Sequence, residues 1–276
     1  MKSDTQRIRV RNSNHSSIRK NQAGFTIVEL LIAGLLGLVL IAGIIQLFVG
    51  SNRNYSLQNE LANIQEDGRF AMIFLEEEIQ KGGWVDSFDV DVQPAIDISL
   101  SEDSTSDKVA VSYKMQIDGV ANRDCNGTVV GDGVITNTFF VGGTSGEEFM
   151  CQGNGGGVAQ PLINGVKNFQ VLYGVETNGL CSDGAVNQYM TKDQIVAAGG
   201  NMTVVSVRVA LLIASDEGVL SSAESQTHDL LDQDIATNDK LAYRTFQQTI
   251  FMPNAIYSTA GNPANAVDCK AASAFS

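Results

Sequence analysis

The spacing of hydrophobic residues differs from one part of the chain to the next. From Phe25 to Val49 nearly every residue is apolar, and a single charged side chain, Glu29, interrupts the run. About 25 apolar residues are long enough to cross a bilayer as a helix, which needs about 20. Apolar residues then recur at steps of three and four, which predicts a helix with one buried face. That stripe is Leu57, Leu61, Ile64, Gly68, Met72, Leu75 and Ile79.

The apolar face widens near the end of this predicted helix. Phe70, Ile73 and Phe74 add to it, as expected where a helix enters a globular core. Glu77 and Lys81 have the spacing of an ion pair one turn apart, and two glycines follow at 82–83 as a stop. We therefore expect a membrane-spanning helix over 25–50 that continues as an amphipathic stalk over 51–83.

Beyond Gly83 the period changes to two, which is typical of strands. Val109, Val111, Tyr113 and Met115 form one alternating set, and Phe169, Val171 and Tyr173 another; Tyr243–Met252 is a third. The segment 204–213 is apolar on both faces, which predicts a central strand. Residues 176–202 and 216–240 are polar and are expected to be loops. The predicted fold is α+β, with the long N-terminal helix packed on an antiparallel sheet in a head spanning 84–276.

Charge is distributed unevenly along the chain. The total is −13, but residues 1–24 hold six cations against Asp4 and carry +5, so the remainder carries −18. Cations before the apolar run place the N-terminus in the cytoplasm and export the head. An acidic head repels phosphate, which argues against direct binding of nucleic acid.

The four cysteines lie in the exported part, at Cys125, Cys151, Cys181 and Cys269. Their spacing, with no C-x-x-C pair and no nearby histidine, fits no zinc pattern. An even count in an exported domain favours two disulfides, with reduced buried thiols as the alternative. Three pairings are possible, and nesting of short loops favours Cys125–Cys151 with Cys181–Cys269.

Glu29 poses a physical problem in a simple membrane anchor. An isolated carboxylate in hydrocarbon costs several kcal/mol or more. Cleavage between Gly24 and Phe25 would create a positively charged amino group four residues before Glu29, on the same side of the helix. The carboxylate would then have a cation on its own chain or on a neighbouring copy, and a paired buried charge is tolerated.

The sequence GFTIVE at 24–29, after a basic segment and before an apolar helix, resembles the leader of type IV pilins and type II secretion pseudopilins. The resemblance implies that a prepilin peptidase removes residues 1–24 and methylates Phe25. It also implies that Glu29 pairs with the N-terminus of an adjacent subunit during assembly.

Segments of the stalk and head resemble the PilW-type minor pilins more closely than the J-type pseudopilins. They are LQNELANIQEDGRFAMIFLEEEIQKGGW (57–84), LINGVKNFQVLYGVET (162–177), VVSVRVALLIAS (204–215) and LAYRTFQQTIFMPNA (241–255). The likeness implies a subunit in the tip or priming complex of a type IV pilus, serving twitching, adhesion or DNA uptake. Implied partners are other minor pilins, the major pilin, a tip adhesin and the inner-membrane assembly platform. The protein would lie in the inner membrane with a periplasmic head, and then in the pilus.

The sequence gives little support for catalysis, a cofactor or a metal. No nucleophile elbow, phosphate loop or zinc-protease motif occurs, and NGGGVA at 154–159 reads as a turn. The segment around Glu224, His228 and Asp229 is expected to be a solvated loop. The acidic stretches 86–97 and 101–107 could bind Ca²⁺ through clustered oxygens, although neither follows the spacing of a twelve-residue calcium loop.

Two other functions remain open from the sequence. The chain could be a minor pseudopilin of a type II secretion system, which shares the leader. It could also be a membrane-anchored adhesin or DNA-uptake receptor that binds through its head.

Overall fold

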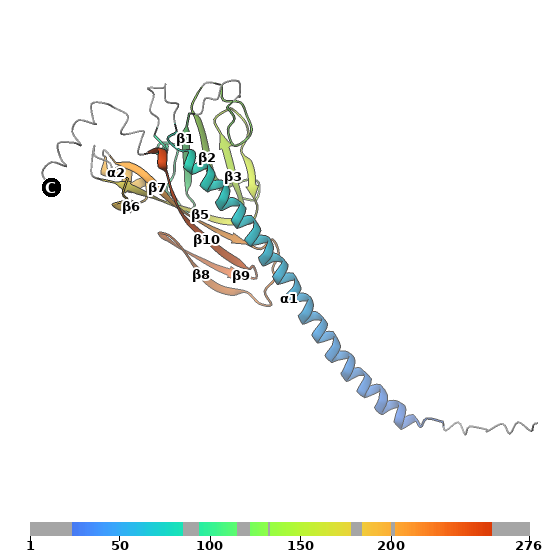
Figure 1. The fold of residues 1–276 in the computed structure, drawn as a ribbon. Coiled ribbons are helices and arrows are strands. Elements are labelled where there is room, and N and C mark those ends of the chain that lie inside the picture. Colours follow the sequence, from blue (N-terminus) through green and yellow to red (C-terminus); the bar gives the residue numbers. More distant parts are fainter. Residues whose placement is uncertain are drawn as a thin grey trace, which may run out of the picture. The chain divides into compact units, whose positions relative to one another are not determined.

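The computed structural model describes residues 24–84, 94–114, 122–131, 133–177, 184–199 and 202–255. The chain divides into two compact units, Met1–Asn52 and Arg53–Ser276. Helix α1 (Ile27–Lys81) contributes residues to both (Figure 1). Its bounds agree with the helix predicted from the apolar run and the stripe that follows it.

In the second unit, α1 buries one side against the sheets of the head. Ile64, Gly68, Met72, Leu75 and Ile79 are all buried, as the stripe predicted. The helix ends where expected: Gly83 has a φ of 75°, which favours glycine, and its N–H donates to the carbonyl of Ser112.

Two predictions about the end of α1 were wrong. Phe70 and Ile73 do not widen the buried face but are about half exposed, at 50% and 47%. Lys81 pairs with Glu78, 2.5 Å away, and not with Glu77. Glu78 is buried among the apolar residues of the stripe. Because it is polar, the apolar pattern of the sequence did not identify it as a buried residue.

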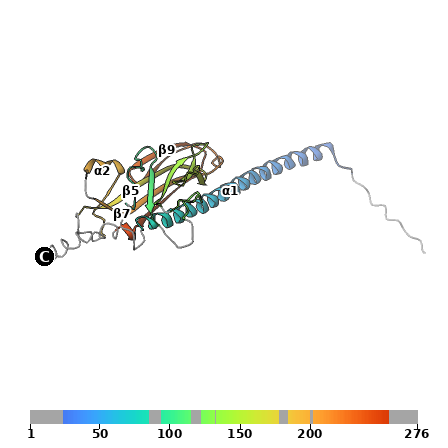
Figure 2. The same cartoon turned by 90° about the horizontal axis from the view of Figure 1, so that it is seen from above.

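The head contains two four-stranded antiparallel sheets and a separate hairpin, whereas the sequence predicted a single sheet. The first sheet has the order β1-β2-β3-β4, and the second β10-β7-β5-β6. The strands of the first are β1 (Lys108–Tyr113), β2 (Ile135–Gly142), β3 (Glu148–Gly153) and β4 (Gln160–Ile163). Those of the second are β5 (Val166–Glu176), β6 (Gln188–Met190), β7 (Thr203–Ala214) and β10 (Tyr243–Phe251). Figure 2 shows the C-terminal part of α1, which belongs to the second unit, beside the strands of the head.

The predicted central strand is confirmed. β7 pairs with β10 on one side and β5 on the other, and residues 205–207 and 209–214 are buried. One face of β7 packs in the main core with α1 residues, and Ala210 and Leu212 on the other face pack against Leu230. Burial on both faces explains why this strand reads as a nearly continuous apolar run.

The two segments predicted to be loops both contain regular structure. Within 216–240, β8 (Glu224–Leu230) and β9 (Gln233–Asp239) form an antiparallel hairpin. Within 176–202 lie β6 and helix α2 (Lys192–Ala198), whose N-cap Thr191 forms a capping box with Gln194. Both were missed because polar residues dominate, although the T-x-x-Q sequence at 191–194 is itself a helix-start signal.

Candidate functional site: the assembly helix and the stalk–head junction

The first unit contains an apolar helix whose side chains are exposed within the part of the chain that the structure describes. Its large apolar side chains are exposed, from Phe25 at 82% and Ile27 at 81% to Val49 at 42%. By length and composition, α1 is the one helix among the described residues able to cross a membrane. Such a surface needs an apolar environment, supplied by a bilayer or by other helices.

Glu29 is the only charged residue from 25 to 52. It lies in the first turn of α1, where its N–H donates to the hydroxyl oxygen of Thr26 at 3.2 Å. Leu30 N–H donates to the Thr26 carbonyl at 3.1 Å, so Thr26 acts as the start of the helix. Among the described residues, none donates a hydrogen bond to the Glu29 carboxylate. The position suits a carboxylate because the helix dipole is positive there.

At the other end of α1, the buried carboxylate of Glu78 joins the helix to the first sheet. Asn137 on β2 donates from Nδ2 to Glu78 Oε2 at 2.7 Å, and the Tyr113 hydroxyl on β1 donates to the same oxygen at 3.3 Å. Lys81 donates to the second oxygen, Oε1. A buried carboxylate with a cation and two neutral donors is fully partnered, so the contact stabilises the docking of the helix.

The buried position of Tyr113 beside Glu78 changes the pKa of its hydroxyl. Burial raises the pKa of its hydroxyl, and the adjacent Glu78 carboxylate raises that pKa further. The phenol therefore stays protonated and remains a donor to Glu78 at every physiological pH.

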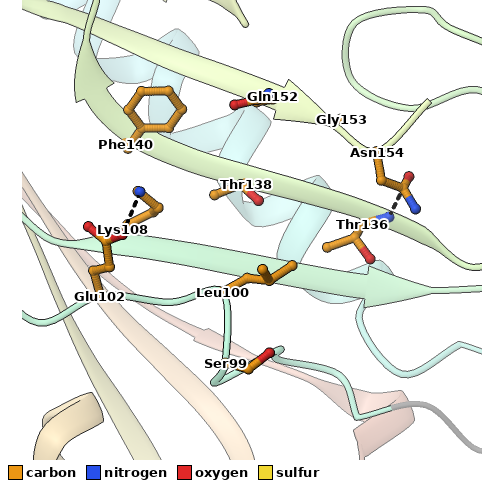
Figure 3. Close-up of a pocket in the computed structure, with 10 residues that line it drawn as sticks. All are labelled: Ser99, Leu100, Glu102, Lys108, Thr136, Thr138, Phe140, Gln152, Gly153 and Asn154. Atoms are coloured by element: carbon orange, nitrogen blue, oxygen red, sulfur yellow. Dashed lines mark hydrogen bonds and ion pairs between the residues drawn. The ribbon is translucent and has the colours of Figure 1, made fainter. Parts of the chain in front are cut away.

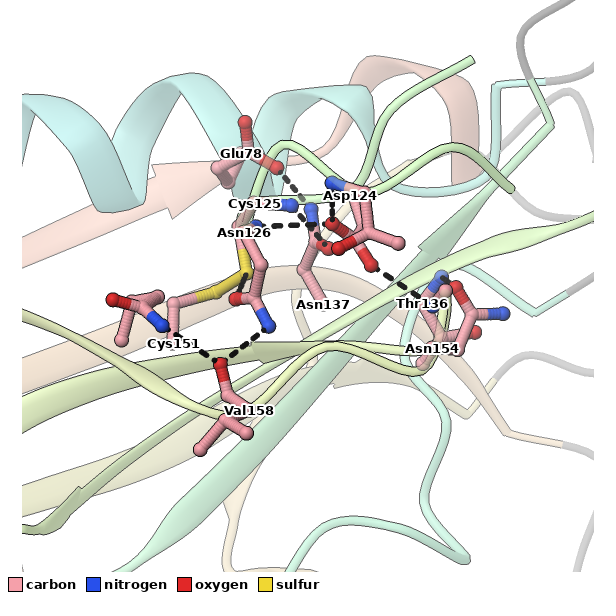
Figure 4. The surroundings of a disulfide bond; sticks show 12 residues. Glu78, Asp124, Cys125, Asn126, Thr136, Asn137, Cys151, Asn154 and Val158 are labelled. Atoms are coloured by element: carbon pink, nitrogen blue, oxygen red, sulfur yellow. Dashed lines mark hydrogen bonds between the residues drawn. A yellow bond between two sulfur atoms is a disulfide. The ribbon is translucent and has the colours of Figure 1, made fainter.

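Asn137 also connects Glu78 to a disulfide-bonded loop (Figure 4). Its Oδ1 accepts the backbone N–H of Cys125 at 3.0 Å, and Cys125 is bonded to Cys151 on β3. This is the first pairing that the sequence favoured. The second, Cys181–Cys269, lies outside the described residues.

Asp124 organises the rest of that loop. Its Oδ1 accepts the N–H groups of Asn126 at 3.0 Å and Thr128 at 2.9 Å, and its Oδ2 accepts that of Gly155 at 2.8 Å. A Cβ at Gly153 would lie 2.1 Å from the Asp124 Cγ, so only glycine fits there. The predicted turn at 154–159 is confirmed, and Asp124 ties it to the disulfide loop.

An open groove of about 390 Å³ lies along the outer face of the first sheet. Figure 3 shows the residues that line it. Thr138 and Gln152 line it with side chains that bond to none of the described residues. At one end, Lys108 bonds Glu102 at 2.8 Å and lies 5.5 Å from the centre of the Phe140 ring. The groove can accept a polar ligand or a loop, but its lining has no nucleophile beside a base.

The acidic stretch 101–107 forms a structural corner. Asp107 is buried and accepts N–H groups from Ser104 at 3.0 Å and Val171 at 2.8 Å, which links the start of β1 to β5. Burial raises the pKa of Asp107 to about 7; the two N–H donors oppose that rise, and Asp103 and Asp232 add to it. Within the described residues no group of three or more His, Cys, Asp or Glu side chains is arranged for a metal. Most of the other acidic stretch, 86–97, lies outside the residues that the structure describes.

His228 lies on a strand, contrary to the expected loop. Its Nε2 is 3.1 Å from the Thr237 hydroxyl, and its ring centre is 4.8 Å from that of Tyr243. Burial lowers the pKa of His228, while Asp239 opposes that shift. These contacts fasten the β8–β9 hairpin to β10 and do not assemble a catalytic group.

The structure brings Glu78, Asn137 and Asp124 together, and none of them was singled out from the sequence. Glu78 had one available signal, since it lies three residues after Leu75 on the buried stripe. Asn137 and Asp124 had none, because their roles depend on contacts between distant strands and loops.

Comparison with known families gives two matches. Residues 138–254 match the model of the type IV pilus-assembly protein W, and residues 19–45 match the prokaryotic N-terminal methylation motif. No curated protein matches the chain. Among solved structures, a type IV-like pilin from Thermus thermophilus is similar over 72% of this chain and 98% of its own, at 15% identity and a TM-score of 0.44.

The methylation motif, the apolar helix and the antiparallel head are those of a type IV pilin-like protein. The PilW family model matches residues 138–254, less than half of the chain, and this match agrees with the resemblance to PilW-type minor pilins seen in the sequence.

Proposed function

We propose that this protein is a minor pilin that enters the type IV pilus, in its tip or priming complex, through the helix that begins at Phe25. The supporting observation is the single carboxylate of Glu29 in an otherwise apolar, uncovered helix. Burial of that helix among other helices supplies the free energy of assembly. Pairing of Glu29 with a free amino group removes the cost of the buried charge and sets the register between subunits.

In this proposal a prepilin peptidase cuts between Gly24 and Phe25 and the new N-terminus is methylated. Before assembly the chain spans the inner membrane once, with residues 1–24 cytoplasmic and the head periplasmic. The head then contacts other minor pilins, the major pilin, a tip adhesin and the assembly platform. Loss of the protein would reduce twitching, adhesion or DNA uptake through loss of pili.

Variants at Gly24 and Glu29 separate processing from assembly. Gly24→Ala, or a bulkier residue, should block cleavage and leave full-length protein in the inner membrane. Glu29→Ala should be cut normally but be depleted from sheared pili, while Glu29→Asp retains part of the incorporation. Equal amounts of Glu29→Ala and wild-type protein in pili would reject the role in register.

A minor pseudopilin of a secretion system is the second candidate of the same class. The leader and the apolar helix support it equally, since both are shared by the two systems. Deletion of the gene distinguishes the minor pilin from the minor pseudopilin. Loss of pili with normal secretion supports the pilin, and loss of secretion with normal pili supports the pseudopilin.

A binding role for the head is the third candidate, and the groove beside Phe140 is the observation that favours it. Thr138→Ala with Gln152→Ala should then lower adhesion while pili remain normal in number. Adhesion that falls only when pili are lost would exclude this role.

A further inference from the structure

The second sheet has an outer face, on the side of the strands opposite to the core that it shares with α1. The odd-numbered residues of 207–213 on β7 belong to that core, and the even-numbered residues between them point to the outer face because side chains alternate along a strand. On the outer face Ala210 and Leu212 pack against Leu230 of the β8–β9 hairpin. Arg208 lies on the same face, next to this packed cluster but outside it.

Two neighbours hold the Arg208 side chain in one orientation. Its guanidinium carbon lies 4.0 Å from the centre of the Tyr189 ring on β6, and its Nε donates to the Thr249 hydroxyl on β10 at 3.3 Å. Gly174 on β5 makes room for that ring, because an added Cβ would lie 3.1 Å from Tyr189 Cε1 and 2.1 Å from the Ser206 hydroxyl. A guanidinium that is already stacked and bonded loses little entropy when it binds a further group.

Arg208 has no acidic partner among the described residues. Partly buried lysines of the head do have one, as Lys108 has Glu102 and Lys167 has Glu147. By contrast, no ion pair joins Arg208 to a described residue, and its two terminal nitrogens donate no hydrogen bond there. Stacking on a ring leaves the edge of the guanidinium open. That edge matches the two oxygens of a carboxylate, which it binds through parallel hydrogen bonds.

An exposed aromatic residue lies beside this cation. Phe251 is two residues after Thr249 on β10, so it shares the outer face, and it is 47% exposed. Arginine and tyrosine are enriched among the residues that contribute most to binding at protein interfaces. The chain after residue 24 carries a net charge of −18, which repels nucleic acid and anionic membranes. A single carboxylate on a polypeptide is therefore the anion that this position favours.

We propose that Arg208, Tyr189 and Phe251 form a docking site for a segment of another protein in which an acidic residue stands beside an apolar one. The carboxylate bonds the terminal nitrogens of Arg208, and the apolar side chain packs on Phe251. The site belongs to the head alone and lies on the opposite side of the second sheet from α1. The inference therefore goes beyond the proposed function and does not depend on it.

A photocrosslinking residue, p-benzoylphenylalanine, introduced in place of Phe251 in cells that express the full chain tests the site. The expected result is a crosslink that mass spectrometry maps to another protein, next to an aspartate or glutamate. Arg208→Gln should lower the yield of this crosslink by about tenfold, because the acidic residue loses its partner. The control Lys240→Gln removes the same charge from an exposed position just after β9 and should leave the yield unchanged.

Two further variants test the chemistry of the contact. Arg208→Lys keeps the charge but neither stacks in the same way nor binds both carboxylate oxygens, so it should also lower the yield. Arg208→Glu combined with a change of the mapped acidic residue to arginine should restore the crosslink. Formation of the Cys125–Cys151 disulfide in each variant shows that the head has folded.

Three results would overturn the inference. They are a crosslink that keeps its full yield in a folded Arg208→Gln variant, a crosslink to nucleic acid or lipid, and no crosslink from position 251. Absence of the wild-type chain from pili would instead reject the proposed function and would leave the crosslink result as it stands.

Discussion

Asn137 on β2 donates a 2.7 Å hydrogen bond to the Glu78 carboxylate on α1, and its own side-chain oxygen accepts the N–H of Cys125. One buried amide therefore connects the stalk helix, the first sheet and the disulfide loop. Each of these elements begins far from the others in sequence, so the contact forms only when the head has assembled on the helix. We expect it to be a main determinant of how firmly the helix holds the head.

Removal of one partner should cost more than removal of both. Asn137→Ala leaves the buried Glu78 without its closest neutral donor and should lower the free energy of unfolding by about 1–3 kcal/mol. Glu78→Leu combined with Asn137→Leu removes the buried charge as well and should recover part of that loss. Chemical denaturation of the full-length protein in detergent measures both.

Gln80→Ala is the control for this pair, because Gln80 is exposed on the same turn of α1. It should change stability by less than about 0.5 kcal/mol. A double variant as unstable as the sum of its two single variants would show that Glu78 and Asn137 are not coupled.

The Cys125–Cys151 disulfide should contribute strongly to head stability. The two residues are 26 apart, and closing a loop of that length in the unfolded chain is worth about 3–4 kcal/mol. Cys125→Ser with Cys151→Ser should lower the denaturation midpoint accordingly, with no change in leader processing. A midpoint equal to that of the oxidised wild type would show that the loop is held by Asp124 and Asn137 alone.

Gly68 on α1 lies against the ring of Phe246 on β10 of the second sheet. An added Cβ there would lie 2.3 Å from the Phe246 ring, so Gly68→Ala should destabilise the head by about 1–3 kcal/mol despite the better helix propensity of alanine. Phe246→Leu in the same chain should restore part of the loss, because the smaller side chain leaves room. Thermal unfolding of the two variants measures this, and a Gly68→Ala variant more stable than wild type would contradict the packing.

Asp107 should make the head less stable as pH rises. Its folded pKa of about 7 lies above the ordinary value of 3.8, so the folded state binds the proton more tightly than the unfolded state. The stability that protonated Asp107 adds to the head is therefore fully present below about pH 4 and is lost as the pH rises through 7. Asp107→Asn cannot titrate, and its one side-chain oxygen can accept from either Ser104 or Val171 but not from both, because these N–H groups bond different oxygens of Asp107. Unfolding measured from pH 4 to 8 should decline less steeply in this variant, and an unchanged slope would contradict the assignment.

The sequence predicted those parts of the structure that depend on local periodicity. The buried stripe from Ile64 to Ile79 and the central strand β7 each have a strong apolar pattern, and both are confirmed. The β8–β9 hairpin was missed because Asp229 and Asp234 are typical of loops, and its strand character depends on packing of Leu230 against Ala210 and Leu212. In this hairpin the tertiary contact outweighs the low strand propensity of the polar residues.

Some residues of the candidate site could be predicted from the sequence and others could not. Glu29 could be identified from the sequence because a charge within an apolar run requires a physical explanation. The contact of Glu78 with Asn137 could not, because the two residues are 59 positions apart. Nor could the exposure of Phe70, since a helical pattern does not show how much of the helix the head covers.

The central claim is that an amino group, freed by cleavage before Phe25, offsets the cost of Glu29 within a bundle of apolar helices. Mass spectrometry of this chain from sheared pili tests it most directly. The account predicts an N-terminal peptide that begins with methylated Phe25 and contains Glu29. A chain found in pili with any other first residue would contradict it.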